Sequence, residues 1–214
     1  MRTARGRKLS STRWLQRQLN DPYVQAAQRD GYRSRAAYKL LHIDERFELL
    51  KPGTSVVDLG AAPGGWTQVV VDRVEPATTG ARVVAIDLLE MEPMAGVTVL
   101  SGDIEEEVAI AQLKGAIGGP VEVVLSDMAT STTGHAATDH LRTITLAEAA
   151  FLFACEVVAP RGAFVTKVFQ GSDEPALFAA LQERFDKVRR FKPKASRADS
   201  VEMFLVATGF KNAG

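Results

Sequence analysis

From residue 54 onward, short apolar runs rich in valine and isoleucine alternate with longer segments of helical periodicity. Apolar runs of this kind predict parallel strands that helices cover on both faces. Strands are expected at 55–59, 82–87, 97–100, 121–127, 162–169 and 202–208. Helices are expected near 66–74, 105–117, 139–158 and 174–185. The pattern therefore predicts an α/β, Rossmann-like fold with a doubly wound, mostly parallel sheet.

At its two ends the chain departs from the strict alternation of strand and helix. Residues 34–47 ("SRAAYKLLHIDERF") have helical periodicity, and Ser34 is a suitable N-cap. The stretch 186–191 ("DKVRRF") reads as a short strand shortly before the last one, so an antiparallel C-terminal strand is expected. We expect an N-terminal extension over 1–33 and the α/β domain over 34–214.

The formal net charge is zero, but the charges are segregated. Residues 1–40 hold ten Lys/Arg against two Asp/Glu, and residues 184–197 hold seven against one. Two basic segments on an acidic body favour a polyanionic partner, and two solvated surface segments are the alternative. The acid-free first 19 residues also have the composition of a transit peptide. Basic character continues past residue 19, which favours a segment that belongs to the functional protein over a cleaved transit peptide.

The cysteine and histidine content and the length of the apolar runs limit the environment and the ligands that we expect. A single cysteine, Cys155, excludes an internal disulfide framework and fits a reducing cytoplasm. No apolar run reaches membrane-spanning length, so no membrane partner is expected. The three histidines lack metal-ligand spacing, so no metal site is expected.

Ligands of this fold bind beyond the carboxyl ends of the strands, where the glycine-rich loop of "VVDLGAAPGGW" (56–66) is expected. The loop lacks the G-x-G-x-x-G of dinucleotide sites, and Trp66 stands where a P-loop needs lysine. Asp87, at the end of the second expected strand, is placed to accept hydrogen bonds from ribose hydroxyls. A nucleoside without a pyrophosphate fits best, and we expect S-adenosylmethionine with its amino-acid end against the loop backbone.

Six motifs then occur in order over residues 34–209: "SRAAYKL", "VVDLGAAPGGW", "AIDLLEMEP", "LSDMA", "KVFQG" and "SRADSVEMFLVATG". Together they resemble the FtsJ/RrmJ family of ribosomal RNA 2′-O-methyltransferases. The resemblance extends almost to the N-terminus and implies that the basic start belongs to the mature protein, where it contacts RNA. It also implies methylation of a uridine in the A loop of 23S rRNA, with the large ribosomal subunit as partner.

The resemblance implies roles for cofactor-binding residues. Gly64 and Trp66 match the contacts to the methionine portion, Asp87 the ribose-binding acid and Asp103 the residue at the adenine. Asp127 is expected between the cofactor and the family's catalytic tetrad. Two alternatives remain: Trp66 as a staple between helix and sheet, and Asp103 as a helix cap compatible with adenine contact.

The family's catalytic tetrad matches Lys39, Asp127, Lys167 and Glu202. The resemblance makes Lys167 the general base for the ribose hydroxyl. Burial and the charge of Lys39 favour a neutral amine there, whereas Asp127 and Glu202 favour an ammonium. In the second case Lys167 orients the hydroxyl and stabilises developing negative charge. The sequence leaves both open.

Some features depart from the family pattern. Thr130 and Ser131 stand where the family usually has Pro and Asn, and the stretch after "KVFQG" is short. The RNA target is thus less defined than the reaction. Methylation of a tRNA anticodon loop or an mRNA cap, or a non-catalytic ribosome-assembly role, are alternatives. A nicotinamide-dependent oxidoreductase is disfavoured by the missing G-x-G-x-x-G. We expect a cytoplasmic monomer that acts on RNA and not on DNA.

Overall fold

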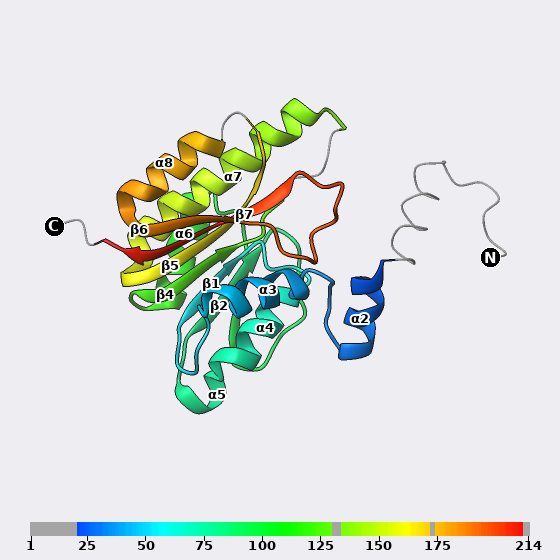
Figure 1. Ribbon diagram of the computed structural model, residues 1–214. Helices are drawn as coiled ribbons and strands as arrows, with labels where there is room; N and C mark the ends of the chain where they lie inside the picture. The colour runs from blue at the N-terminus through cyan, green and yellow to red at the C-terminus, as the bar shows by residue number, and fades with distance from the viewer. Residues whose placement is uncertain (1–20, 130–133, 172–173, 212–214) are drawn as a thin grey trace.

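A computed structural model describes residues 21–129, 134–171 and 174–211. Its core is a seven-stranded sheet in the order β3-β2-β1-β4-β5-β7-β6 (Figure 1). The strands are β1 (Val56–Leu59), β2 (Val83–Asp87), β3 (Val97–Ser101), β4 (Val121–Ser126), β5 (Val158–Phe169), β6 (Phe185–Phe191) and β7 (Glu202–Phe210). Strands β1 to β5 are parallel, and β7 is antiparallel to both β5 and β6. The predicted fold class is confirmed.

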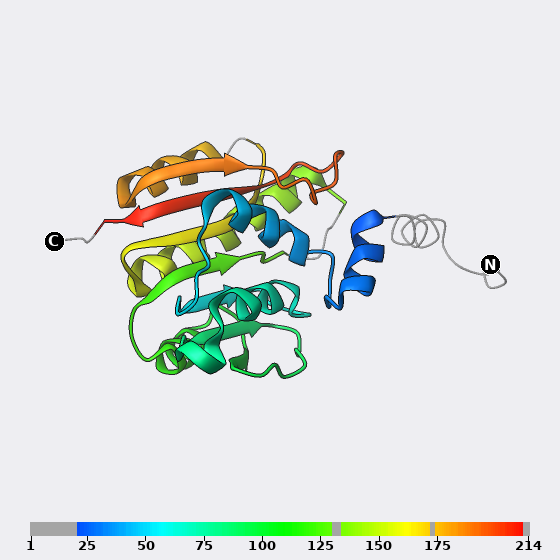
Figure 2. The same ribbon diagram turned by 60° about the horizontal axis from the view of Figure 1, so that its bottom comes forward.

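Helices cover both faces of the sheet (Figures 1 and 2). One face carries α3 (Ala37–Phe47), α4 (Gly65–Val74) and the short α5 (Pro76–Thr79). The other carries α6 (Glu107–Ile117), α7 (Ala136–Val157) and α8 (Glu174–Arg184). A separate hydrophobic cluster fills each side, which explains why all four residues of β1 are buried.

Two predicted helix starts are wrong. Ser34 does not cap α3, because a turn precedes the helix and the amide of Ala37 already bonds the Ser34 carbonyl at 3.3 Å. The Ser34 hydroxyl packs against Gly65 instead: a Cβ added at Gly65 would lie 2.2 Å from it. Helix α7 begins at Ala136 rather than near the expected residue 139, and Asp139 lies in its first turn, where its side chain accepts a bond from Gly134 N at 3.3 Å.

An additional helix, α2 (Pro22–Asp30), lies beyond the start of α3 (Figure 1). Asp21 caps it by accepting the amide of Tyr23 at 3.0 Å, and the Tyr23 ring packs 5.3 Å from that of Tyr38. Residues 21–33 thus pack against the α/β domain, and a division at residue 33 stays a prediction. The basic residues of 1–20, and Thr130 and Ser131, lie outside the described residues.

Two negative findings concern the described ranges only. Among these residues, no helix is long and apolar enough to cross a membrane. Nor do they contain three histidine, cysteine or acidic residues grouped as metal ligands would be.

Candidate active site

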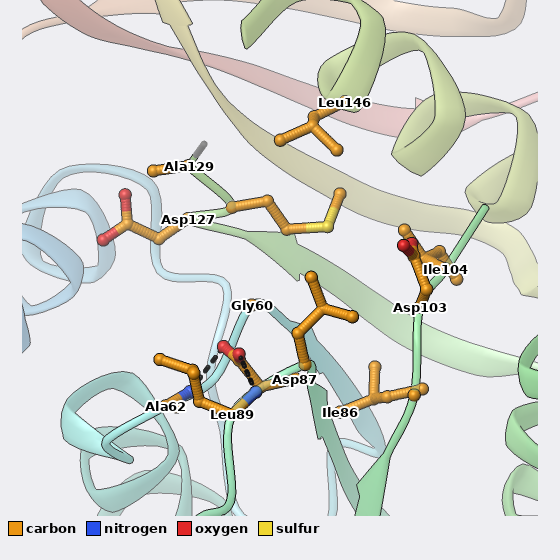
Figure 3. A pocket seen from close by; sticks show the side chains of 13 residues that line it. Gly60, Ala62, Ile86, Asp87, Leu89, Asp103, Ile104, Asp127, Ala129 and Leu146 are labelled. Carbon is orange, nitrogen blue, oxygen red and sulfur yellow. Dashed lines mark hydrogen bonds between the residues drawn. The ribbon is translucent and has the colours of Figure 1, made fainter. Parts of the chain in front are cut away.

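An open pocket with a volume of about 210 Å³ lies at the carboxyl edge of the parallel strands (Figure 3). Three acids at or just after the ends of parallel strands line it: Asp87 at the end of β2, Asp103 after β3 and Asp127 after β4. Gly60 and Met128 form its floor between β1 and β4. The sequence-predicted strand ends therefore meet at one cavity.

Gly60 is required by this packing. Its φ is +74°, and a Cβ there would lie 2.8 Å from the Cα of Met128. No side chain fits so close to another backbone, and glycine alone adopts this conformation without strain. The loop after β1 can therefore lie directly beside the loop after β4.

Asp87 joins two loops of the pocket. One of its carboxylate oxygens accepts the amide of Ala62 at 2.9 Å and the other accepts the amide of Leu89 at 2.8 Å (Figure 3). A carboxylate has about four acceptor positions, so capacity for ribose hydroxyls remains. Asp103 lines the pocket while its side chain accepts the amide of Glu105 at 2.9 Å. Helix α6 begins only at Glu107, with Glu106 as its N-cap, so the expected helix cap at Asp103 is wrong; its side chain instead stabilises the turn before the helix while it lines the pocket.

The side chain of Trp66 lies outside the pocket. It is 3% exposed, donates its indole N–H to the Ala36 carbonyl at 2.8 Å and packs 5.5 Å from the Phe204 ring. Trp66 thus joins α4 to the start of α3 and to β7 of the sheet, as the packing alternative predicted. Gly64, with φ +107°, is covered by Arg33 and Met91 and does not line the pocket either. A contact of either residue to a cofactor would therefore come from its backbone.

A fourth carboxyl group, Asp58, is fully buried at the end of β1. It accepts the Thr67 hydroxyl at 2.7 Å through Oδ2, and its Oδ1 has no hydrogen-bond partner. Burial raises the pKa of Asp58 to about 7, and the charges of Asp127 and Asp87 add to this increase. Such a concentration of carboxyl groups fits a cofactor that carries positively charged groups.

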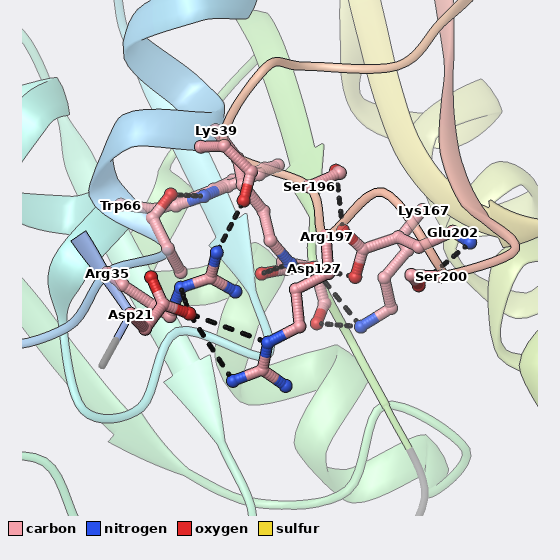
Figure 4. Close-up of polar contacts among 12 residues, drawn as sticks. Asp21, Arg35, Lys39, Trp66, Asp127, Lys167, Ser196, Arg197, Ser200 and Glu202 are labelled. Carbon is pink, nitrogen blue, oxygen red and sulfur yellow. Dashed lines mark hydrogen bonds and ion pairs between the residues drawn. The ribbon is translucent and has the colours of Figure 1, made fainter. Parts of the chain in front are cut away.

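The four tetrad residues come together beside the pocket (Figure 4). Nζ of Lys39, from α3, lies 2.8 Å from Glu202 Oε2 and 3.6 Å from Asp127 Oδ2. Nζ of Lys167, from β5, lies 3.1 Å from Asp127 Oδ1 and donates to the Asp127 carbonyl at 2.7 Å. Lys39 and Lys167 are only 8% and 6% exposed. Two buried lysines and two acidic residues thus form one cluster.

Asp127 belongs to both the pocket and the cluster. Burial by itself would raise the pKa of Asp127, but the ammonium groups of Lys167 and Lys39 outweigh it and hold that pKa below its ordinary value. A permanent carboxylate at this point separates the two lysines and faces the pocket. Any group bound in the pocket therefore lies next to the lysine cluster.

Several residues around the cluster were missed from the sequence. The Ser196 hydroxyl donates to Glu202 Oε1 at 2.8 Å, and Arg35 donates to the neighbouring Ala195 carbonyl at 2.6 Å. Asp21 lies 3.0 Å from Arg35 Nε and 3.5 Å from Arg197 Nε (Figure 4). The only sequence signal was the location of Ser196 and Arg197 in the motif that contains Glu202.

Comparisons with known proteins identify the family of the chain. A family model described as FtsJ-like methyltransferase matches residues 32–210. A protein of Rhodospirillum rubrum named ribosomal RNA large subunit methyltransferase E is 58% identical over 99% of this chain and 81% of its own. One of the same name from Paramagnetospirillum magneticum is 57% identical over 100% of this chain and 88% of its own.

A solved structure shows the same similarity. It is a Plasmodium falciparum protein named as a ribosomal RNA methyltransferase, with a TM-score of 0.74 and 30% identity. The match covers 84% of this chain and 98% of that one.

Proposed function

Because this chain belongs to the FtsJ-like methyltransferase family, with S-adenosylmethionine as methyl donor, we propose that it methylates the ribose 2′-hydroxyl of a uridine in 23S rRNA. The proposed site is the A loop of the large subunit. The names of its relatives support ribosomal RNA as the acceptor. The observation that carries the proposal is the position of Asp127, which lines the pocket and holds both lysines.

The described residues fit the methyl donor. Asp87 would hold its ribose, Asp103 would lie at the adenine, and the backbone of residues 60–66 would hold its methionine portion. The donor supplies a methyl group on a sulfonium, which is a good leaving group. The protein then has to align the acceptor oxygen and manage its proton.

Lys167 is the residue we assign to the ribose hydroxyl. An ammonium group has three N–H directions. The Asp127 carbonyl accepts one of them at 2.7 Å, and Asp127 Oδ1 is an ion-pair partner at 3.1 Å, so donor capacity remains for a substrate oxygen. A neutral amine in this place accepts the hydroxyl proton, and an ammonium stabilises the oxygen as it becomes negative. Lys39 contacts Asp127 and is itself held by Glu202.

The basic segment 184–197 would contact RNA phosphates through part of its charge. Arg190 pairs with Glu174 at 2.9 Å, and Arg197 pairs with Asp21, so both have structural partners. Lys187 and Lys194 are exposed, and their side chains make no hydrogen bond or ion pair with another residue of the described ranges. These two lysines are the best candidates for phosphate contact.

A single chain carries the pocket and the cluster, so we propose a monomer that works in the bacterial cytoplasm on the large subunit. The 2′-hydroxyl would be the feature that excludes DNA. The test supplies labelled S-adenosylmethionine with large subunits, free ribosomal RNA, tRNA and DNA in parallel, and then maps the labelled nucleotide. We expect label on one 2′-O-methyluridine of the large-subunit RNA. Label on tRNA alone would contradict the proposal, and ribosome binding without transfer would indicate an assembly factor.

A further inference from the structure

The Arg33 side chain connects the loop after β1 with the loop after β2. Its Nη1 donates to the Glu92 carbonyl at 2.8 Å and to the Pro63 carbonyl at 3.4 Å. Its Nη2 donates to the Pro93 carbonyl at 3.1 Å. One guanidinium therefore ties the loop after β1 to the loop after β2.

An arginine is well suited to this position. The guanidinium forms no ion pair with any carboxylate of the described residues, and its acceptors there are three backbone carbonyls. A planar fork of fixed donors reaches several carbonyls at once, whereas a lysine ammonium acts as a single point. Gly64 makes room for it, since a Cβ there would lie 2.8 Å from Arg33 Nη1 and 3.1 Å from its Cδ.

The backbone of Arg33 is anchored as well. Its amide donates to Gln68 Oε1 at 2.7 Å, and Gln68 Nε2 donates to the Gly31 carbonyl at 2.9 Å. Gln68 lies in α4, which begins directly after the glycine loop. The arginine is thereby fixed at its backbone and at its guanidinium.

The same two loops form one wall of the pocket through Ala62, Leu88 and Leu89. Asp87 joins them on the pocket side, as described above. Arg33 joins them a second time, and it does not line the pocket. We propose that Arg33 is a positioning residue that sets the spacing of these loops before the methyl donor binds. Its removal would make binding carry the cost of ordering them.

The inference rests on the proposed cofactor pocket, and calorimetry with S-adenosylhomocysteine tests both. For Arg33→Ala we expect a dissociation constant about tenfold above wild type, the effect of losing one to two charge-assisted hydrogen bonds. Arg33→Lys keeps the charge and should be intermediate. The matched control is Arg29→Ala, since Arg29 is 74% exposed at its side chain and pairs with Asp30.

Steady-state kinetics separate positioning from RNA contact. In Arg33→Ala the KM for S-adenosylmethionine should rise, while kcat and the KM for large subunits should stay within about twofold of wild type. Unchanged cofactor binding in Arg33→Ala, or a rise in the KM for RNA alone, would overturn the inference. If Arg33→Ala does not fold, Arg33→Lys decides by the same two measurements. Failure of the wild-type protein to bind S-adenosylhomocysteine would overturn the pocket itself and the inference with it.

Discussion

Ser196 Oγ donates a 2.8 Å hydrogen bond to one carboxylate oxygen of Glu202, and the other oxygen of that carboxylate lies 2.8 Å from Nζ of Lys39. Glu202 is therefore held from two sides, by the loop before β7 and by α3. The loop is itself fastened to α3, because Arg35 donates to the Ala195 carbonyl and His42 accepts the Ala195 amide at 3.3 Å. The orientation of Lys39 thus depends on a hydroxyl outside the tetrad.

Ser196→Ala should lower kcat by about three- to tenfold, since it removes a hydrogen bond to a charged group. Affinity for S-adenosylhomocysteine should not change, because Ser196 does not line the pocket. Single-turnover rates and calorimetry measure the two effects. Ser200→Ala is the matched control: Ser200 accepts the backbone amide of Glu202 at 3.1 Å and leaves its carboxylate alone. Equal losses in both variants would assign the effect to the loop as a whole.

Lys167→Ala should retain binding of S-adenosylhomocysteine and lose turnover by at least about a hundredfold, because no other described side chain takes its position at Asp127 Oδ1. Lys187→Ala, which alters an exposed lysine, should keep nearly normal single-turnover rates at saturating RNA. Near-normal turnover in Lys167→Ala would remove Lys167 from the reaction.

The pH dependence of the wild-type single-turnover rate distinguishes the two forms of Lys167. If a neutral amine accepts the proton, the rate should rise with pH and then level off, and Lys167→Arg should be inactive. If an ammonium stabilises the oxygen, the rate should not require its deprotonation, and Lys167→Arg should keep measurable activity.

Asp58 should make the protein less stable as pH rises toward neutrality. Burial raises its folded pKa to about 7, above that of an unfolded aspartate at about 4. Between these two pKa values the folded state binds more protons than the unfolded state. The contribution of Asp58 to the free energy of unfolding is therefore complete below about pH 4, and it is lost as pH rises through the folded pKa. Urea unfolding between pH 5 and 8 should show a loss on the order of a few kcal/mol that Asp58→Asn abolishes. An identical slope in wild type and Asp58→Asn would exclude Asp58 as its source.

Trp66→Phe should separate packing from cofactor contact. The variant keeps an aromatic ring against Phe204 and loses the indole donor to the Ala36 carbonyl. We expect a free energy of unfolding about 1 kcal/mol lower and unchanged affinity for S-adenosylhomocysteine. A large loss of affinity without loss of stability would instead place the indole itself at the cofactor.

The sheet and the pocket acids were predictable because parallel strands end at one edge, which Asp87, Asp103 and Asp127 mark in the sequence. Lys39 was not predictable from periodicity, since an exposed helix lysine has the same pattern; only the family resemblance identified it. Ser196 and Arg33 were missed because their partners are defined by tertiary contacts. Arg33 bonds carbonyls 30 to 60 residues away, and carbonyls carry no signal in a sequence.

The place of β7 has a consequence for synthesis of the protein. It follows β5 and β6 in the chain yet lies between them in the sheet, and its first residue is Glu202. Until a ribosome has made this strand, β5 has no neighbour on that side and Lys39 lacks Glu202, the nearer of its two carboxylate partners. Every nascent copy therefore passes through a stage without Glu202 in place, and completion of the proposed catalytic cluster coincides with insertion of β7 into the sheet.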